Sequence, residues 1–547
     1  MPPTRFGHRG RRMCSAGGFA GLLGLAGVLA ACTGPADEPP TAEQQLQTSV
    51  AARNAEPLTE PLPRPGGAAL VALPPCVPSG RGTDYAVGPG QPLASLDQVP
   101  WEQLKAGDTV RLYPSAQPYR GKFLVAAQGT ASAPVRICGV RGADGQRPVI
   151  DGNGATTRPA LAAAFAGSAS EIVQARAIVM IKALSSDAWG DAPAYVQIDG
   201  LKLTGVHPSY GFRDAAGTAR SYEQFGACVW IDRGSAITIA DNEITDCPIG
   251  VFSRSTDDGP AALTRELRIA GNVIHGNGIA GSDREHNTYT QGVGVVIEHN
   301  VYGPLRDGAL GNAIKDRSAG LVVRYNRIEE GAHALDLVEA EDFPLTALAT
   351  PAYRVTTVHG NQIRKRGETG AVVHYGGDHY GSWPGARWGE PIYRKGTLQF
   401  FHNTVLVTGA QGAIFRLSTT EEVAEVRNNV LVFASTVTQR SLRMNQTVVA
   451  PWTGGGVLRL GRNWLSAGWQ DTDPWHPVGG TLEVTAPQVV GALSPLERGG
   501  WRPQVGSAVV DAAVANGDAA AWQLDASGVS RARVTAGAGP DLGAVER

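Results

Sequence analysis

The sequence predicts an all-β protein that folds as a single-stranded, right-handed parallel β-helix, which is a solenoid of stacked coils. From about residue 196, short alternating apolar strands recur, and each runs into a turn that carries Asn or Gly. Successive turn asparagines lie 26 to 42 residues apart, which corresponds to one coil per period with insertions. The 70 glycines and only four methionines in 547 residues are also typical of a turn-rich β protein.

Each repeat joins a short strand to a turn asparagine, as Ile237 and Ile239 precede Asn242. Such strands cannot bury a face alone, so coils must stack in parallel to cover their inward side chains. We expect each Asn to adopt the left-handed turn backbone and to bond to the equivalent Asn one coil away. This Asn ladder would comprise Asn242, Asn272, Asn300, Asn326, Asn361, Asn403, Asn429 and Asn463. An antiparallel sandwich or a propeller is disfavoured, because Asn-Gly hairpin signals are scarce and propeller blades need a steadier period.

The start of the chain has the order of a secretory signal. Four arginines precede a small and apolar run over residues 17–28, and Leu29-Ala30-Ala31-Cys32 follows. This arrangement resembles the lipobox of bacterial lipoproteins. The resemblance implies that residues 1–31 are removed and that Cys32 carries the lipid. Since Thr33 rather than Asp follows Cys32, it also implies the outer membrane if the host is Gram-negative. An ordinary signal peptide with a chance Cys is the alternative.

The remaining chain divides into a tether and one folded domain. Residues 32–80 are rich in Pro and Ala, which is typical of an extended spacer. Residues 81–547 are predicted to form the β-helix, including an N-terminal cap and a C-terminal closing coil. Outside the signal, no stretch reaches the roughly 18 apolar residues of a spanning helix. We therefore expect a monomer that meets the membrane only through its lipid.

Charge and cysteine content narrow the functions. Removing the signal takes four arginines and no acid, so the formal charge falls from -2 to -6. A nucleic-acid partner is disfavoured, because neutralising phosphates needs a basic surface. Four cysteines remain after Cys14 and Cys32, and they allow three pairings. We favour Cys228 with Cys247 and Cys76 with Cys138; a metal site is the competing interpretation, without CxxC spacing to support it.

Both ends of the predicted domain resemble β-helix enzymes of the pectate-lyase-like superfamily, which degrade polysaccharides. The N-terminal motifs lie at residues 101–112, 119–121, 129–135 and 148–152, and the closing-coil motifs at residues 506–511 and 540–546. The resemblance covers about residues 84–547. It implies an exported protein whose partner is a polysaccharide substrate.

Candidate catalytic residues lie between residues 285 and 376. Glu285 to Tyr289, Ile314 to Ser318, Val323 to Ile328 and Leu335 to Leu337 resemble motifs of a subgroup of bacterial polysaccharide-degrading β-helix proteins, with Asp316 where that subgroup has Ser. If Ile314, Leu335, Leu337 and Val373 point inward, the alternate residues point outward. Coils about 4.8 Å apart would then form an outward column of Tyr289, Lys315, Asp336 and His374, with Arg317 beside it.

This set favours β-elimination on a uronate-containing polysaccharide. We expect Lys315 to be the base, Arg317 to clamp the substrate carboxylate, and Tyr289 or His374 to protonate the leaving oxygen. Asp336 would favour the charged form of Lys315 and weaken it as a base. The residues expected to contact substrate are His286, Asn287, Arg254, Tyr375 and Trp383.

Three alternatives stand beside this hypothesis. Lys315 and Arg317 could be solvated outer-face residues paired with Asp336. The acidic runs at residues 257–258 and 339–342 could serve a glycoside hydrolase or hold Ca²⁺; no cofactor is predicted with certainty, and no other metal is expected. A non-catalytic, lipid-tethered polysaccharide binder could use Trp189, Trp383 and Trp388 as stacking platforms.

The lipoprotein hypothesis predicts that radioactive palmitate labels the wild-type protein but not the Cys32→Ala variant, because only Cys32 has the flanking residues of a lipobox. Labelling is measured on the protein after electrophoresis. Label that persists in the variant would reject this assignment.

Overall fold

The computed structural model describes residues 73–163, 174–366, 370–379, 390–409, 411–444, 454–472, 479–515 and 520–547. The chain divides into Met1–Thr48 and Ser49–Arg547, and all described residues belong to the second unit. Cys32, the predicted signal and most of the predicted tether lie outside the described residues. None of the described helices is long and apolar enough to cross a membrane.

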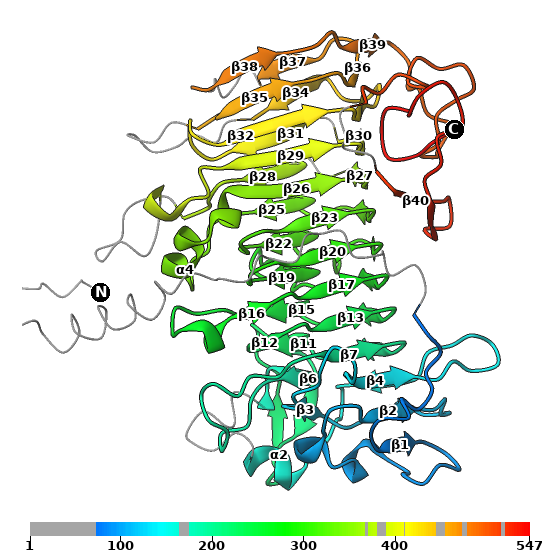
Figure 1. Cartoon of the computed structure of the whole chain (residues 1–547), viewed down its shortest axis with the longest axis vertical. Helices are drawn as coiled ribbons and strands as arrows, with labels where there is room; N and C mark the ends of the chain where they lie inside the picture. The colour runs from blue at the N-terminus through cyan, green and yellow to red at the C-terminus, as the bar shows by residue number, and fades with distance from the viewer. Residues whose placement is uncertain are drawn as a thin grey trace, which may run out of the picture. The chain divides into compact units, whose positions relative to one another are not determined.

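Three parallel sheets run along the described chain, and each coil contributes strands to them (Figure 1). Sheet 1 consists of β1 (Asp84–Val87), β2 (Thr109–Leu112), β4 (Val135–Gly139), β7 (Val196–Asp199), β13 (Thr238–Ala240), β17 (Arg268–Ala270), β20 (Val296–Glu298), β23 (Val322–Arg324), β26 (Val355–His359), β29 (Thr397–Phe401), β32 (Val423–Arg427), β35 (Val457–Leu460) and β38 (Thr481–Val484). Sheet 2 consists of β3 (Phe123–Val125), β6 (Ala177–Ile181), β11 (Ala227–Ile231), β15 (Ile249–Ser253), β19 (Thr288–Thr290), β22 (Ile314–Asp316), β25 (Leu335–Leu337), β28 (Val373–Tyr375), β31 (Gln411–Leu417), β34 (Gln439–Arg443) and β37 (Gln470–Thr472).

Sheet 3 follows the asparagine turns. It consists of β5 (Val149–Asp151), β8 (Lys202–Thr204), β14 (Glu243–Thr245), β18 (Val273–His275), β21 (Val301–Tyr302), β24 (Arg327–Glu329), β27 (Gln362–Lys365), β30 (Thr404–Val407), β33 (Val430–Phe433), β36 (Trp464–Ser466) and β39 (Val489–Gly491). Three smaller pairs are β9 (Gly211–Arg213) with β10 (Ala219–Ser221), β12 (Gly234–Ser235) with β16 (Thr264–Arg265), and β40 (Trp522–Leu524) with β41 (Ser530–Ala532). The α-helices are α2 (Pro159–Ala163) and α4 (Pro344–Ala349); the 3-10 helices are η1 (Leu96–Gln98), η2 (Trp101–Gln103), η3 (Pro260–Ala262), η4 (Pro351–Arg354) and η5 (Glu390–Ile392).

The predicted parallel β-helix is confirmed, and its core lies inside the coils. In sheet 1, Ile198, Ile239, Ile269 and Ile297 occupy equivalent positions in successive coils, and all are fully buried. Alternation turns their neighbours outward. The inward stack therefore fixes the register of every outward side chain.

The predicted Asn ladder is also confirmed. The side-chain amide of Asn326 donates to Asn361 Oδ1 at 3.0 Å, and Asn300 donates to Asn326 in the same way. One detail of the prediction is wrong: the left-handed residue is the one before the ladder position, such as Asp241 at φ 52° or Tyr325 at φ 56°. The preceding residue makes the turn, and the Asn itself is fully buried, where its backbone N–H and its side-chain amide both bond to the next Asn, as Asn326 N donates to Asn361 Oδ1 at 2.9 Å.

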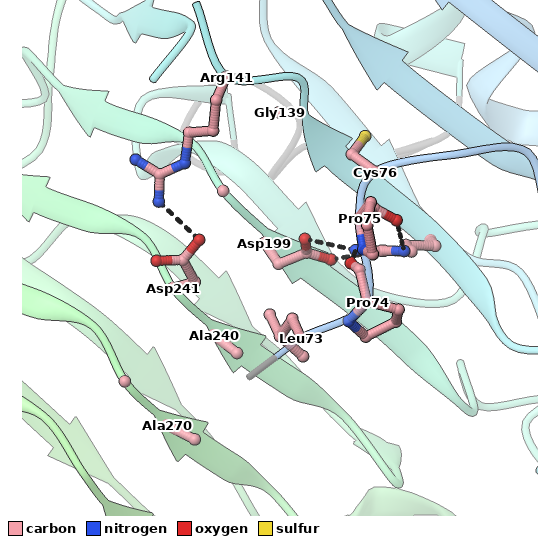
Figure 2. Close-up of a pocket in the computed structure, with 13 residues that line it drawn as sticks. Leu73, Pro74, Pro75, Cys76, Gly139, Arg141, Asp199, Ala240, Asp241 and Ala270 are labelled. Carbon is pink, nitrogen blue, oxygen red and sulfur yellow. Dashed lines mark hydrogen bonds and ion pairs between the residues drawn. The ribbon is translucent and has the colours of Figure 1, made fainter. Parts of the chain in front are cut away.

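Both predicted disulfides are present. Cys76 joins Cys138 at the end of β4, and Cys228 in β11 joins Cys247 in the turn before β15, with Cα–Cα distances of 5.7 and 5.6 Å. The first bond fixes residues 73–76 across sheet 1. There they form one wall of a hollow of about 350 Å³, beside the ion pair of Arg141 with Asp241 (Figure 2).

The C-terminal segment does not form the predicted closing coil. After β39 the chain leaves the solenoid and packs along sheet 3, where Val509 and Leu542 cover Val430 and Trp464. Its β40–β41 hairpin reaches back to earlier coils, and Ala521 N donates to Tyr325 Oη at 3.2 Å. The physical reason is that outward apolar residues of sheet 3 need a cover, which a further coil would not supply.

The ladder predicts a specific stability loss. Asn326→Ala should lower the free energy of unfolding by about 1–3 kcal/mol, because buried partners of its amide stay unsatisfied. The urea midpoint measures this change, and Asn153→Ala, at an exposed turn position, serves as the control. Equal midpoints for both variants would contradict a stabilising ladder.

Candidate active site

The predicted outward column lies on sheet 2, where the strand register brings its members together. Tyr289 pairs with Lys315, Lys315 with Asp336, and Asp336 with His374 in consecutive coils. The inward neighbours expected from alternation, among them Ile314 and Leu335, belong to the core. The prediction that these four side chains share one column is therefore confirmed.

The column is not an open, solvated face. The side chain of Lys315 is 9% exposed and that of Arg317 is 3% exposed. Residues from the turns between sheets 2 and 1 contact them, namely Glu339 and Glu341 after β25 and Asp378 after β28. The interpretation of Lys315 and Arg317 as solvated surface residues is therefore wrong, since both are buried under these turns.

Lys315 is held between two carboxylates. Its Nζ lies 2.6 Å from Asp336 Oδ2 and 2.6 Å from Asp378 Oδ2. Burial lowers the pKa of Lys315, but the charges of Asp336 and Asp378 raise it by more, so the pKa lies above its usual value. The ammonium therefore stays charged in this arrangement, which disfavours the expected role of Lys315 as a base.

Arg317 uses its donors within the protein. Its Nε donates to Tyr289 Oη at 2.8 Å, Nη1 donates to the Glu339 backbone oxygen at 2.8 Å, and Nη2 donates to Asp378 Oδ1 at 3.1 Å. Burial lowers the pKa of Arg317, while Asp378 and the other acidic groups raise it well above its usual value. These donors are therefore not available to clamp a substrate carboxylate, as was expected. They hold the side chains of Tyr289 and Asp378 in position instead.

Tyr289 lies between a cation and an anion. Its hydroxyl donates to Glu341 Oε1 at 2.7 Å and accepts from Arg317 Nε. Burial raises the pKa of Tyr289 well above its usual value, although Arg317 opposes this shift. The resting phenol is protonated, with a carboxylate in place to receive its proton and a guanidinium in place to stabilise its anion.

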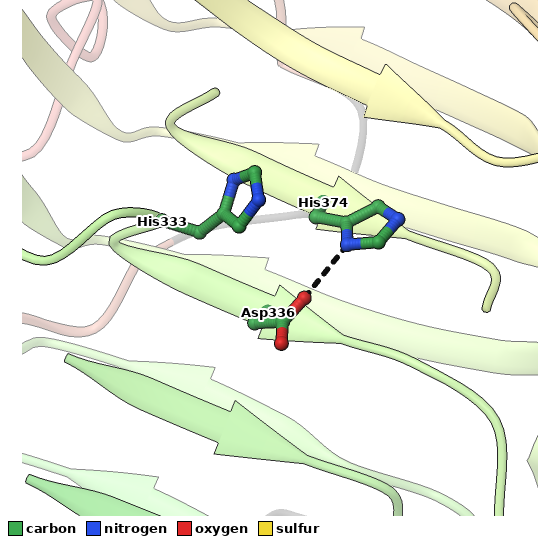
Figure 3. Close-up of side chains that lie close together, drawn as sticks. All are labelled: His333, Asp336 and His374. Atoms are coloured by element: carbon green, nitrogen blue, oxygen red, sulfur yellow. Dashed lines mark hydrogen bonds and ion pairs between the residues drawn. The ribbon is translucent and has the colours of Figure 1, made fainter. Parts of the chain in front are cut away.

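His374 and Asp336 belong to the same hydrogen-bond network, and Figure 3 shows the bond between them. His374 Nδ1 lies 2.7 Å from Asp336 Oδ1, and its Nε2 lies 3.0 Å from Ser418 Oγ. Burial raises the pKa of Asp336, but Lys315 and His374 lower it by more, so this carboxyl stays ionised. Ser418 is buried and bonds to the backbone of Gly377, with N and O at 2.9 and 2.7 Å from its Oγ. The Ser-His-Asp order therefore supports a loop and does not present a nucleophile.

His379 lies beside the acidic groups at the more open side of the site. Its Nδ1 lies 2.7 Å from Glu339 Oε1, and its Nε2 lies 3.1 Å from Glu341 Oε2. Burial lowers the pKa of His379, but the bond to Glu339 and the charge of Asp378 raise it above its usual value. The side chains of Asp378 and Glu341 are 25% and 16% exposed, so these groups form the solvent-accessible edge of the site.

Two groups of potential metal ligands lie here among the described residues: His333 with Asp336 and His374, and Glu339 with Asp378 and His379. In the first, the ammonium of Lys315 already lies 2.6 Å from Asp336. In the second, Arg317 contacts both carboxylates. A divalent ion at either group would lie beside these cations, so the arrangement disfavours the Ca²⁺ site that the acidic run at residues 339–342 could have formed.

The other sequence candidates have separate positions. His286 is buried, and burial lowers its pKa to about 3. Asn287, which was expected to contact substrate, is buried in a turn, where it bonds to Asn277 and to the Gly303 backbone. Tyr375 points into the core, because it follows outward His374, so it cannot contact substrate. Arg254 is half-exposed and lies 3.7 Å from Asp232, whereas Trp383 and Trp388 lie outside the described residues.

Four functional candidates come from turns rather than strands: Glu339, Glu341, Asp378 and His379. Residues 339–342 stood out as an acidic run, but nothing indicated that they fold over Lys315 and Arg317. The other acidic run, residues 257–258, has a structural role. The Asp257 carboxylate accepts hydrogen bonds from Leu345 N and Thr346 N, at 3.0 and 2.9 Å, at the start of α4. The expectation of a hydrolase or Ca²⁺ site at Asp257 is therefore corrected.

Stability should depend on pH through His379. Because its folded pKa lies above the usual 6.5, its stabilisation is present at about pH 6 and is lost as pH rises through the folded pKa. The urea midpoint should thus fall more in His379→Gln at about pH 6 than at about pH 9. His207→Gln is the control with the opposite trend, because burial lowers the pKa of His207. Identical losses at both pH values would contradict the charged contact.

No family model matches the chain. No curated protein matches it either. Among solved structures it is similar to an alginate lyase from Paenibacillus sp. str. FPU-7 (TM-score 0.31, 14% identity, 71% of this chain and 94% of that chain). It is also similar to the pectate lyase Pel9A (0.40, 10%, 85% and 97%) and to a GH136 lacto-N-biosidase from Eubacterium ramulus (0.39, 12%, 75% and 68%). Similarity at this level assigns no activity to this chain, because function depends on the site and not on the fold.

Proposed function

We propose that the protein is an exported enzyme that cleaves a uronate-containing polysaccharide by β-elimination. The observation that carries the proposal is the position of the Tyr289 hydroxyl, 2.8 Å from Arg317 Nε and 2.7 Å from Glu341 Oε1, one coil from the charged Lys315. β-Elimination needs a cation at the substrate carboxylate, a base for the adjacent proton and an acid for the leaving oxygen. Lys315 and Tyr289 supply these three functions.

Lys315 is the cation in this mechanism. An ammonium has three N–H donors, and Asp336 and Asp378 accept two of them. The third donates to the substrate carboxylate and withdraws charge, which makes the hydrogen on the adjacent carbon more acidic. The two aspartates hold Nζ in position and keep it protonated, so Lys315 needs no rearrangement during the reaction.

Tyr289 transfers the proton. When substrate binds, the Tyr289 hydroxyl passes its proton to Glu341, to which it already donates, and Arg317 stabilises the phenolate that remains. The phenolate removes the C5 proton of the uronate, the C4–O bond breaks as the C4–C5 double bond forms, and the regenerated phenol protonates the leaving oxygen. The reaction involves no oxidation or reduction, and each turnover returns the protons of the site to their starting positions.

Hydrolysis is the second candidate, because Glu341 and Asp378 are the more open carboxylates of the site and both contact Arg317. Paired carboxylates are the usual catalytic groups of glycoside hydrolases. In that mechanism Lys315 and Arg317 would keep Asp378 ionised, because burial raises the pKa of this carboxyl but their charges lower it by more. We also propose that Cys32 carries a lipid that holds the enzyme at the cell envelope.

The elimination mechanism predicts an unsaturated product that absorbs ultraviolet light, measured across a panel of acidic polysaccharides. Tyr289→Phe should reduce kcat by at least roughly 100-fold, since it removes the positioned proton carrier. Lys315→Ala should reduce it comparably, because the substrate carboxylate loses its cation. Tyr195→Phe, which alters an exposed tyrosine next to β7, should retain full activity.

The same assays separate the two candidates. New reducing ends without ultraviolet absorbance, abolished by both Glu341→Gln and Asp378→Asn, would replace elimination with hydrolysis. Full activity of Tyr289→Phe and Lys315→Ala on every polysaccharide that is cleaved would place the reaction elsewhere on the molecule.

A further inference from the structure

Trp189 is the most exposed aromatic side chain among the described residues, with 56% of its surface exposed. It lies in the turn between β6 and β7. Leaving an indole in water forgoes the stabilisation that burial would give. The contacts of this ring show that its exposure is not the result of a loose side chain.

The indole is fixed by two separate contacts. The guanidinium of Arg233 stacks on the ring, with Cζ 4.2 Å from the ring centroid, and Trp189 Nε1 donates to the Asp258 backbone oxygen at 3.2 Å. Arg233 is itself buried, and its Nη1 donates to the backbone oxygens of Trp189 and Ala261 at 2.6 and 3.1 Å. Because Arg233 covers one face, the exposed area belongs mainly to the other face and the edges.

The surroundings of the Trp189–Arg233 pair suit a hydroxylated and uncharged ligand. The carboxylates of Asp232, Asp187 and Asp191 lie close enough to Arg233 for their charges to act on it. Carboxylates accept hydrogen bonds from hydroxyl groups but repel a second carboxylate. An aromatic face on a surface with such acceptors matches a pyranose, whose ring carbons present C–H groups on one face and hydroxyls at the rim.

This platform lies on the same series of turns as the candidate active site. The turn after β15 contacts Trp189 through the backbone of Asp258 and Arg233 through the backbone of Ala261. The same turn contains Asp257, whose carboxylate accepts hydrogen bonds from the first turn of α4. Helix α4 begins two residues after Asp342, at the end of the acidic run over the site. From β6 to β19, the strand that carries Tyr289, there are three coil steps, or about 14 Å at about 4.8 Å per step. A polysaccharide lying along the helix axis would span this distance with a few sugar units.

We infer that Trp189 forms a remote subsite that stacks against a neutral pyranose a few units from the bond that is cleaved. The inference rests on the proposed function for the cleavage step and extends it to the substrate class: a long heteropolymer that carries uncharged sugars beside its uronates. Binding at Trp189 requires no catalysis, so the subsite can be tested separately from the reaction.

The kinetic test compares long polymer with oligosaccharides too short to reach from Tyr289 to Trp189. Trp189→Ala should raise KM for the polymer by roughly tenfold, the scale of one aromatic contact, with kcat unchanged and with the oligosaccharides cleaved as by wild type. Trp189→Phe should retain most of the polymer affinity, because it keeps an aromatic face. The control is Leu310→Ala, which removes an apolar side chain of similar exposure, 55%, from another turn.

The binding test uses affinity electrophoresis in gels that contain each polysaccharide of the panel. Wild type, Tyr289→Phe and Trp189→Phe should be retarded by the polymer, and Trp189→Ala should migrate as in a blank gel. If wild type and Trp189→Ala migrate alike in every gel, or if Trp189→Ala loses equal activity on the short oligosaccharides, the subsite is rejected. Retardation that depends on Trp189 in a protein whose Tyr289→Phe variant is fully active would reject the proposed mechanism and retain the subsite.

Discussion

The in-register stacking of one coil on the next is the constraint on which the rest of this molecule depends. The stacked isoleucines form the inward face of sheet 1, and the Asn ladder fixes the point at which each coil turns into sheet 3. With the register fixed, residues separated by 21 to 38 positions in the sequence become neighbours, as Lys315, Asp336 and His374 do. A one-residue slip would exchange the inward and outward faces, so the same ladder that stabilises the core also assembles the site.

Electrostatics then determine what the assembled residues can do. Lys315 and Arg317 are both surrounded by carboxylates, and these bonds keep them charged while they hold Tyr289, Asp378 and Glu339 in position. Buried charges are tolerated only when they are paired and hydrogen-bonded. The network is therefore a rigid arrangement of alternating charges in which the phenol of Tyr289 is the group with both a proton acceptor and an anion-stabilising donor beside it.

The sequence was sufficient for the features that follow from period and alternation. The coil repeat, the Asn ladder, the Cys228–Cys247 bond and the column from Tyr289 to His374 could be predicted because each follows from the coil period and strand alternation, whereas the Cys76–Cys138 bond spans 62 residues and was the pair that remained. The same alternation places Tyr375 inside, since it follows outward His374, and a consistent use of the rule would have removed it from the candidates. Glu341 and Asp378 could not be placed, because their turns are positioned by distant contacts such as that of Asp257 with α4. The left-handed residue lies one position before the expected one, because the preceding residue makes the turn and the Asn lies buried behind it.

The C-terminal segment along sheet 3 has a consequence for how the solenoid comes apart. It bonds to coils that are far apart in the solenoid: Ala521 to Tyr325, Ala544 to Thr404, and Val514 to Asn428. In a simple solenoid the terminal coil can detach alone, because each coil contacts only its neighbours. Here the C-terminal residues link distant coils, so loss of an end coil requires release of contacts much further along the axis. These links couple the coils into one cooperative unit, whereas a chain cut short before residue 514 would keep ends that fray coil by coil.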